Sequence, residues 1–282
     1  MQVDSPYRMK QPSRRPSSAE RLRTFQGETL QAYYGEEVCE VDRFDISNPQ
    51  QVAEYANEIF TFLHAKEGDF LPRYGYMKQQ TDINEKMRAI LVDWLIEVHL
   101  KFKLLPETLF LTVNLIDRFL ELEVVMRQKL QLVGVTAMLI ASKYEEIYAP
   151  EVRDFVYITD KAYTKEEVLD MEYHMLTRLD FNCTTPSSFR FLQRYAKVAQ
   201  ADELSFNLAQ YLIELPLIEY KMLRYSPSMV AAAALYVSLR ILKRELNWEE
   251  QLQQFSHLHE AELRPCAKDL CVLLHGIDKI AL

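Results

Sequence analysis

Residues 87–102 read MRAILVDWLIEVHLKF, with apolar side chains on more than one face of the helix that their spacing predicts. One apolar stripe consists of Met87, Ile90, Leu91, Trp94, Leu95, Val98 and Phe102. A second consists of Val92, Ile96 and Leu100. Such a helix is either buried on nearly all sides, or buried on one face and open to a partner protein on the other. The spacing alone leaves both roles open.

Helix start signals extend this pattern along the chain. Asp82 is placed to cap the helix just described, and Pro106 and Pro150 suit the first positions of later helices. Thr164 and Glu167 have the spacing of a capping box. We therefore predict an isolated helix that starts at Asn48-Pro49 and ends by Gly68, followed by helices at about 83–103, 106–122, 127–146, 150 onward and 165–179.

After residues 182–186 the same order of five helices is repeated. The expected ranges are 186–199, 203–220, 227–243, 248–255 and 259–275. The third helix of each set is rich in small residues, among them Gly134 and Ala231–Ala234, which allow neighbouring helices to approach closely. The predicted fold is all-α, with two tandem five-helix bundles preceded by a short N-terminal helix. The expected divisions are a disordered or extended arm (1–47), an N-terminal helix and linker (48–80), a first bundle (81–182) and a second bundle (183–282).

The composition excludes several classes of function. A formal net charge of −8 disfavours broad nucleic-acid binding, because phosphate recognition relies on clustered Lys and Arg. The apolar runs fall short of the ~20 residues that cross a bilayer, so we expect no membrane role. With only 6 glycines the chain has no Gly-rich phosphate loop, and His257 and His259 lack further ligands at metal-site spacing. We predict no catalytic residue, no metal and no cofactor.

The four cysteines are Cys39, Cys183, Cys266 and Cys271. They form neither a CxxC pair nor the regular spacing of a disulfide framework. Reduced thiols in an intracellular protein are the simpler interpretation, so we expect the nucleus and the cytoplasm.

Five ordered motifs resemble those of the cyclin family. They are MRAILVDWL (87–95), which resembles the signature that opens the cyclin box, NLIDRFL (114–120), KLQLVG (129–134), ASKYEEIY (141–148) and YITD (157–160). The resemblance runs from about Asp45 to the end and is closest to the mitotic A- and B-type cyclins, with FKLLPET (102–108) and VGVTAM (133–138) more B-like. It implies two cyclin boxes in a non-catalytic subunit that forms a heterodimer with a cyclin-dependent protein kinase, activates it and recruits its substrates, most typically at G2/M.

The resemblance also implies the residues that bind the kinase. They are Tyr55, Ile59, Phe62, Lys143, Tyr144, Glu146, Ile147, Glu172, Leu176 and Phe181. Without the resemblance, Lys143 is a cation that the dipole favours near a helix C-terminus, and Glu172 is a solvated helix residue.

A second implied site is a shallow apolar patch that recruits substrates and inhibitors with basic-x-Leu docking motifs. Its residues are Met87, Ile90, Leu91, Trp94, Glu97, Leu130 and Gln131. Methionine is adaptable, tryptophan is a flat anchor, and Glu97 suits the basic residue of the motif. The resemblance further implies a buried structural salt bridge between Arg88 and Asp117.

A competing hypothesis is a helical adaptor of the transcription-factor type, because general transcription factors that bind DNA have similar pairs of five-helix bundles. The acidic net charge and the motif matches at 87–95 and 143–148 disfavour it.

Overall fold

The computed structural model of the chain describes residues 40–245 and 247–280, and all of its regular elements in these ranges are helical. The all-α prediction is therefore confirmed. The predicted N-terminal arm lies outside the described residues as far as residue 39. The chain divides into two compact units, Met1–Thr61 and Phe62–Leu282. Among the described residues, no helix combines the length and apolar character that a membrane crossing needs.

The described part of the first unit contains two short 3₁₀ helices, η2 (Glu40–Asp45) and η3 (Ala53–Tyr55), and the first residues of α3 (Ala56–Glu67). The sequence prediction was wrong at both of its boundaries here. Residues 40–45 are helical and not extended, and the N-terminal helix begins at Ala56 and not at Asn48-Pro49. Val52, with a left-handed φ of 49°, interrupts the chain before η3, so a single helix cannot run through it.

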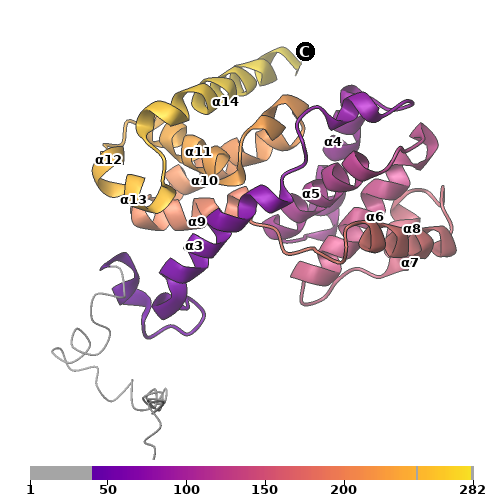
Figure 1. Cartoon of the computed structure of the whole chain (residues 1–282), viewed down its shortest axis with the longest axis horizontal. Helices are drawn as coiled ribbons and strands as arrows, with labels where there is room; N and C mark the ends of the chain where they lie inside the picture. Colours follow the sequence, from indigo (N-terminus) through magenta and orange to yellow (C-terminus); the bar gives the residue numbers. More distant parts are fainter. Residues whose placement is uncertain (1–39, 246, 281–282) are drawn as a thin grey trace, which may run out of the picture. The chain divides into compact units, whose positions relative to one another are not determined.

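The second unit begins with the rest of α3, followed by the 3₁₀ helices η4 (Gly68–Phe70) and η5 (Tyr76–Gln79). The first five-helix bundle comes next (Figure 1). Its helices are α4 (Glu85–Phe102), α5 (Pro106–Leu122), α6 (Arg127–Glu145), α7 (Val152–Ile158) and α8 (Lys165–Arg178). The central helix is α6, which contacts the other four. A Cβ added at Gly134 of α6 would lie 2.7 Å from Cδ1 of Leu91, so the absence of a side chain there allows α4 to approach closely. The small-residue pattern had predicted this central position.

The helix caps agree with the sequence prediction at one start and correct it at another. Thr164 accepts a hydrogen bond from the backbone N–H of Glu167, whose carboxylate accepts one from the N–H of Thr164, so the capping box is confirmed. The α4 cap is Asn84 and not Asp82, since Asn84 Oδ1 accepts from the Met87 N–H at 3.0 Å. Asp82 instead accepts hydrogen bonds from Arg127 at the start of α6.

The second bundle follows within the same unit. It contains α9 (Ser188–Val198), α10 (Glu203–Glu214), η6 (Leu215–Leu217), η7 (Tyr220–Arg224), α11 (Pro227–Ile241), α12 (Trp248–Gln251), α13 (Gln253–Ser256) and α14 (Glu260–Ile280). The central α11 packs against α9, α10 and α14, and its residues Ala231–Ala234 are fully buried. The predicted helix at 203–220 ends early because the chain reaches Pro216, and the one at 248–255 is two short helices.

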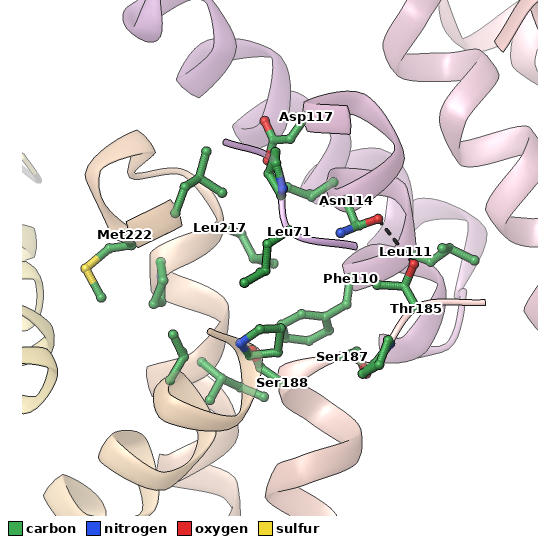
Figure 2. Close-up of a pocket in the computed structure, with 18 of the residues that line it drawn as sticks. Leu71, Phe110, Leu111, Asn114, Asp117, Thr185, Ser187, Ser188, Leu217 and Met222 are labelled. Atoms are coloured by element: carbon green, nitrogen blue, oxygen red, sulfur yellow. Dashed lines mark hydrogen bonds between the residues drawn. The ribbon is translucent and has the colours of Figure 1, made fainter. Parts of the chain in front are cut away.

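A cavity of about 120 Å³ lies where the two bundles meet (Figure 2). Phe110 of α5 stacks on Phe189 of α9 with ring centroids 6.3 Å apart, which packs one bundle against the other. Asn114 Nδ2 donates to the carbonyl of Phe70, and Asn114 Oδ1 accepts from the Thr185 hydroxyl. The junction is therefore held by both stacking and half-buried polar contacts.

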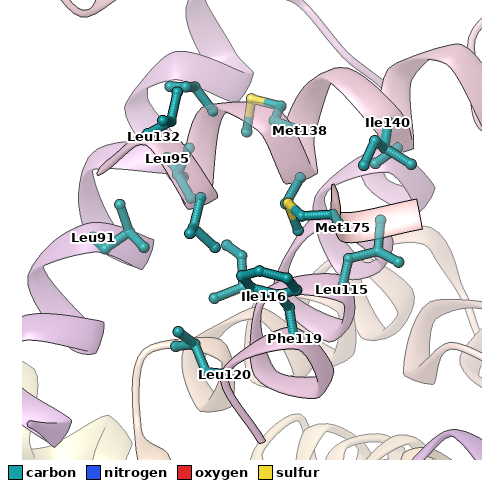
Figure 3. Close-up of a cluster of buried hydrophobic side chains, with 14 of the residues drawn as sticks. Leu91, Leu95, Leu115, Ile116, Phe119, Leu120, Leu132, Met138, Ile140 and Met175 are labelled. Carbon is teal, nitrogen blue, oxygen red and sulfur yellow. The ribbon is translucent and has the colours of Figure 1, made fainter. Parts of the chain in front are cut away.

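The core of the first bundle shows whether the helix at 87–102 is buried on nearly all sides or on one face only (Figure 3). Leu91, Leu95 and Val98 belong to the core cluster, and Val92 of the second stripe is also fully buried, although it lies outside this cluster. The outward positions of α4 recur every three or four residues, at Lys86, Ile90, Asp93, Glu97 and Leu100, and all are exposed. One face of α4 therefore stabilises the bundle while the opposite face meets the surroundings.

Candidate functional site

The predicted docking patch lies on α4 and the first turn of α6. Leu91 and Leu130 are only 6% and 5% exposed, so they form its floor and are core residues more than contact residues. Ile90 is 60% exposed, and Glu97 is exposed one turn beyond Trp94. The half-buried members are Met87, Trp94 and Gln131. The result is a shallow apolar surface with a carboxylate at one side.

Arg88 of α4, the residue after Met87, forms a buried ion pair with Asp117 of α5. Arg88 Nε and Nη2 each donate to one oxygen of Asp117 at 2.6 Å, and each side chain is 1% exposed. The Tyr76 hydroxyl donates to Asp117 at 2.7 Å. Burial and the charge of Asp117 raise the pKa of Tyr76 well above its ordinary value. Burial alone would lower the pKa of Arg88, but Asp117 outweighs burial and the pKa is raised.

Arg88 also reaches the second bundle. Its Nη1 donates to the carbonyl oxygens of Leu217 at 2.9 Å and Ile218 at 3.3 Å. One buried guanidinium therefore joins α4, α5 and the segment after α10, and fixes α4 against both bundles. Sequence reasoning predicted the partner Asp117 but missed the two carbonyl groups, since their position depends on how the bundles pack.

The predicted kinase-binding residues of the first bundle centre on an ion pair between α6 and α8. Lys143 Nζ donates to both carboxylate oxygens of Glu172, at 2.7 and 2.9 Å. The Lys143 side chain is 47% exposed and that of Glu172 13%. Ile147 is 89% exposed, and Tyr144 and Phe181 are also exposed. This arrangement presents fixed charges beside large apolar side chains, which is typical of a protein-binding surface.

Two of the predicted contact residues are engaged within the bundle. Glu146 accepts hydrogen bonds from the Leu105 N–H at 2.7 Å and from the Thr108 hydroxyl at 2.6 Å, at the start of α5. Leu176 is half-buried against the core. Both therefore position the surrounding surface. Sequence reasoning missed the exposed aromatic Tyr148 and Tyr173, although each directly follows a residue already chosen.

The N-terminal helix has a firm attachment at its C-terminal end. The carboxylate of Glu67 accepts hydrogen bonds from the N–H and the hydroxyl of Ser228, at the N-terminus of α11, where the helix dipole favours a negative charge. The His64 ring packs on Phe191 with centroids 4.7 Å apart. Phe62, two residues before His64, is exposed.

The remaining predicted residues of this helix, Tyr55 and Ile59, belong to the first unit and are half-buried. Sequence reasoning had selected neither Glu67 nor His64. In the part of the chain that the structure describes, Cys183, Cys266 and Cys271 carry free thiols, and no cluster of His, Cys, Asp and Glu is arranged to hold a metal.

Comparison with known protein families gives two adjacent matches. Residues 58–184 match the N-terminal domain of cyclins, and residues 185–280 match the cyclin C-terminal domain. Over 237 residues the chain is 50% identical to the G2/mitotic-specific cyclin-B of Spisula solidissima, covering 84% of this chain and 55% of the relative. It is 48% identical over 240 residues to cyclin-B2-1 of Arabidopsis thaliana, covering 85% and 56%. The chain thus spans little more than half the length of these relatives.

Solved structures share the fold. A viral cyclin from herpesvirus saimiri superposes with a TM-score of 0.69 at 19% identity, over 77% of this chain and 96% of the other. A chain of the yeast RNA Pol II CTD kinase CTDK-1 complex gives a TM-score of 0.59 at 14% identity, over 69% and 68%. The tandem-bundle architecture predicted from the sequence is therefore one that known structures also adopt.

Proposed function

Because this chain belongs to the cyclin family, we propose that it is the non-catalytic regulatory subunit of a cyclin-dependent protein kinase. The observation that carries the proposal is the Lys143–Glu172 pair beside the exposed side chains of Tyr144, Ile147 and Phe181. The name of the relative from Spisula solidissima, G2/mitotic-specific cyclin-B, supports action at G2/M. The location that we propose is the nucleus and the cytoplasm.

In this proposal the chain activates the kinase by holding one helix of the kinase in position. The kinase has a regulatory helix whose glutamate pairs with the ATP-site lysine only when that helix is held inward. The exposed apolar side chains bury part of that helix, while Lys143 and Glu172 offer polar contacts to it. An ammonium has three hydrogen-bond donors, and a carboxylate has about four acceptor sites. Lys143 can therefore donate to the kinase, and Glu172 can accept from it, while the two remain paired with each other. Their mutual pairing fixes both side chains before the kinase arrives, which reduces the entropy cost of binding.

The structure supplies a matched control for testing this contact. Lys129 and Glu167 form a second α6–α8 pair at 2.7 Å, and the Lys129 side chain is 47% exposed, as that of Lys143 is. We expect Lys143→Ala to weaken kinase binding by about tenfold or more, the loss typical of a charged hot-spot contact. Lys129→Ala should leave it nearly unchanged. Isothermal titration calorimetry with purified candidate kinases measures both, and equal affinities for the two variants would contradict the proposal.

We further propose that the docking patch recruits substrates and inhibitors that carry a basic-x-Leu motif. The leucine would pack on Met87 and Trp94 above the floor formed by Leu91, and the basic residue would pair with Glu97. Charge complementarity of this kind contributes to selectivity and to the rate of encounter.

Two substrates test recruitment separately from catalysis. Met87→Ala combined with Trp94→Ala should reduce phosphorylation of a protein substrate that carries the motif, while a short peptide substrate without it is phosphorylated at the normal rate. Lys86→Ala, on the outward face of the same helix, is the matched control. Equal losses on both substrates would show that the variant harms the kinase complex and would refute recruitment by this patch.

A further inference from the structure

None of the residues that line the cavity at the junction of the two bundles belongs to the docking patch or to the predicted kinase-binding residues, although Glu145 directly follows Tyr144. Figure 2 shows Phe110 and Leu111 of α5 on one side of the cavity, and Leu217 and Met222 from the segment after α10 on the other. Its volume is about 120 Å³. An engineered apolar cavity of ~150 Å³ holds a benzene molecule, so this one has room for about one large apolar side chain.

The walls of the cavity are held apart by rigid backbone and by polar contacts. Four of the lining residues are prolines, which have a fixed φ and no N–H: Pro72, Pro186, Pro216 and Pro227. Asn114 binds the Phe70 carbonyl and the Thr185 hydroxyl, and Arg88 binds the Leu217 carbonyl. Closing the cavity would break these bonds, so it is a preformed feature of the junction.

The cavity is negatively charged on one side. Glu107 at the start of α5 and Glu145 at the end of α6 both line it and are half-buried. Among the residues that the structure describes, neither carboxylate has a hydrogen bond or an ion pair. Arg88 also lines the cavity, but its charge is matched by Asp117. Burial, and then the charges of Glu107 and Glu146, raise the pKa of Glu145.

The size and the rim indicate what kind of ligand fits. Pockets that bury a whole drug-sized molecule measure ~300–1,000 Å³, so a cavity of about 120 Å³ takes one side chain of a larger partner. Ser188, half-buried at the start of α9, also lines the cavity, and its small side chain leaves the space open.

We propose that this cavity binds a segment of a partner protein that inserts one large apolar side chain, such as Phe or Leu, and places an adjacent Lys or Arg against Glu107 and Glu145. None of the seven docking-patch residues lines the cavity. The chain therefore has a second peptide-binding site, at the junction of the two bundles.

Methyl NMR of the full chain locates binding directly, because both sites contain methyl groups. The probe is the blocked dipeptide acetyl-Phe-Arg-amide. We expect saturable shifts at Leu217 and Val230, which line the cavity. Shifts confined to Leu91 and Leu130, at the docking patch, would overturn the proposal.

Three variants complete the test. Ser188→Phe should fill the cavity and abolish the shifts, whereas Ser188→Ala should preserve them. Glu107→Gln with Glu145→Gln should weaken binding about fivefold, as expected for a partly exposed charge pair, and should melt at no lower temperature than the unmodified chain. If Ser188→Phe fails to fold, the double Gln variant still decides the charge requirement. If the unmodified chain binds acetyl-Phe-Glu-amide as tightly as acetyl-Phe-Arg-amide, the charge requirement is overturned.

Discussion

Replacing Asp117 by Ala removes the acceptor for three donors at once. In the folded chain Asp117 accepts from Arg88 Nε and Nη2 at 2.6 Å and from the Tyr76 hydroxyl at 2.7 Å. Because Arg88 is only 1% exposed, its guanidinium stays largely out of bulk water after the replacement. Removing one partner of a buried pair costs about 3–5 kcal/mol, since a charge is left without a counterion. Native stabilities are only about 5–15 kcal/mol, so this variant loses a large part of the total.

Thermal and urea unfolding measure the loss. At about 2–4 °C per kcal/mol for a domain of this size, the melting temperature should fall by about 10 °C. Arg73→Ala is the control, because Arg73 pairs with Glu121 through a side chain that is 80% exposed, and we expect a loss below about 1 kcal/mol.

A double replacement separates the unpaired charge from the general loss of contacts. Arg88→Met with Asp117→Leu leaves no buried charge, so it should be more stable than Asp117→Ala alone, although the carbonyls of Leu217 and Ile218 lose their donor. A loss below about 1 kcal/mol for Asp117→Ala would refute the argument, and so would a double variant that is less stable than the single one.

Three further changes have outcomes set by the structure. Leu95→Ala should cost about 2–5 kcal/mol in urea unfolding, because Leu95 is fully buried. Gly134→Ala should lower stability by about 1 kcal/mol, since overpacking against Leu91 costs more than the gain in helix propensity. The same variant should bind a docking-motif peptide more weakly, as measured by fluorescence anisotropy. Gly276→Ala is the control and should be stabilising, because the space around Gly276 is open. The pKa of Glu145 is raised above 4.5, so the folded state binds the proton more tightly than the unfolded state and stability falls as the pH rises through that pKa. Glu145→Gln should therefore melt higher than the unmodified chain at pH 7, and a gap that did not shrink toward pH 4 would contradict this assignment.

The sequence predicted best those elements whose boundaries depend on local chemistry. Pro106 begins α5, and the capping box of Thr164 and Glu167 begins α8. The sequence was a poor guide to helix boundaries where the backbone conformation of a single residue interrupts a helical pattern. Val52 in the left-handed region shortens the N-terminal helix, and periodicity does not report such a conformation. Pro216 was a visible signal, because proline in a helix interior removes a hydrogen bond, and it was overridden by the apolar pattern around it.

The candidate sites were predictable only in part, for a physical reason. A motif match identifies Arg88 and Asp117, but the carbonyls of Leu217 and Ile218 reach Arg88 only after the second bundle has packed. The cavity has no signal in the sequence at all, since its walls come from segments far apart in the chain. No sequence pattern distinguishes Glu107 and Glu145 from other charged residues, because only the tertiary structure places them together.

The composition of α4 follows from its position between three different surroundings. Leu95 faces the core of the first bundle, Ile90 and Glu97 face outward, and Arg88 faces the second bundle. A helix at a simple surface needs one apolar face, whereas this one needs two buried faces and an outward face that is itself partly apolar. Its single buried cation lies where the bundles meet and is neutralised there by Asp117. The excess of apolar residues in 87–102 is therefore required both by burial and by the proposed docking patch, and periodicity alone cannot separate these two requirements.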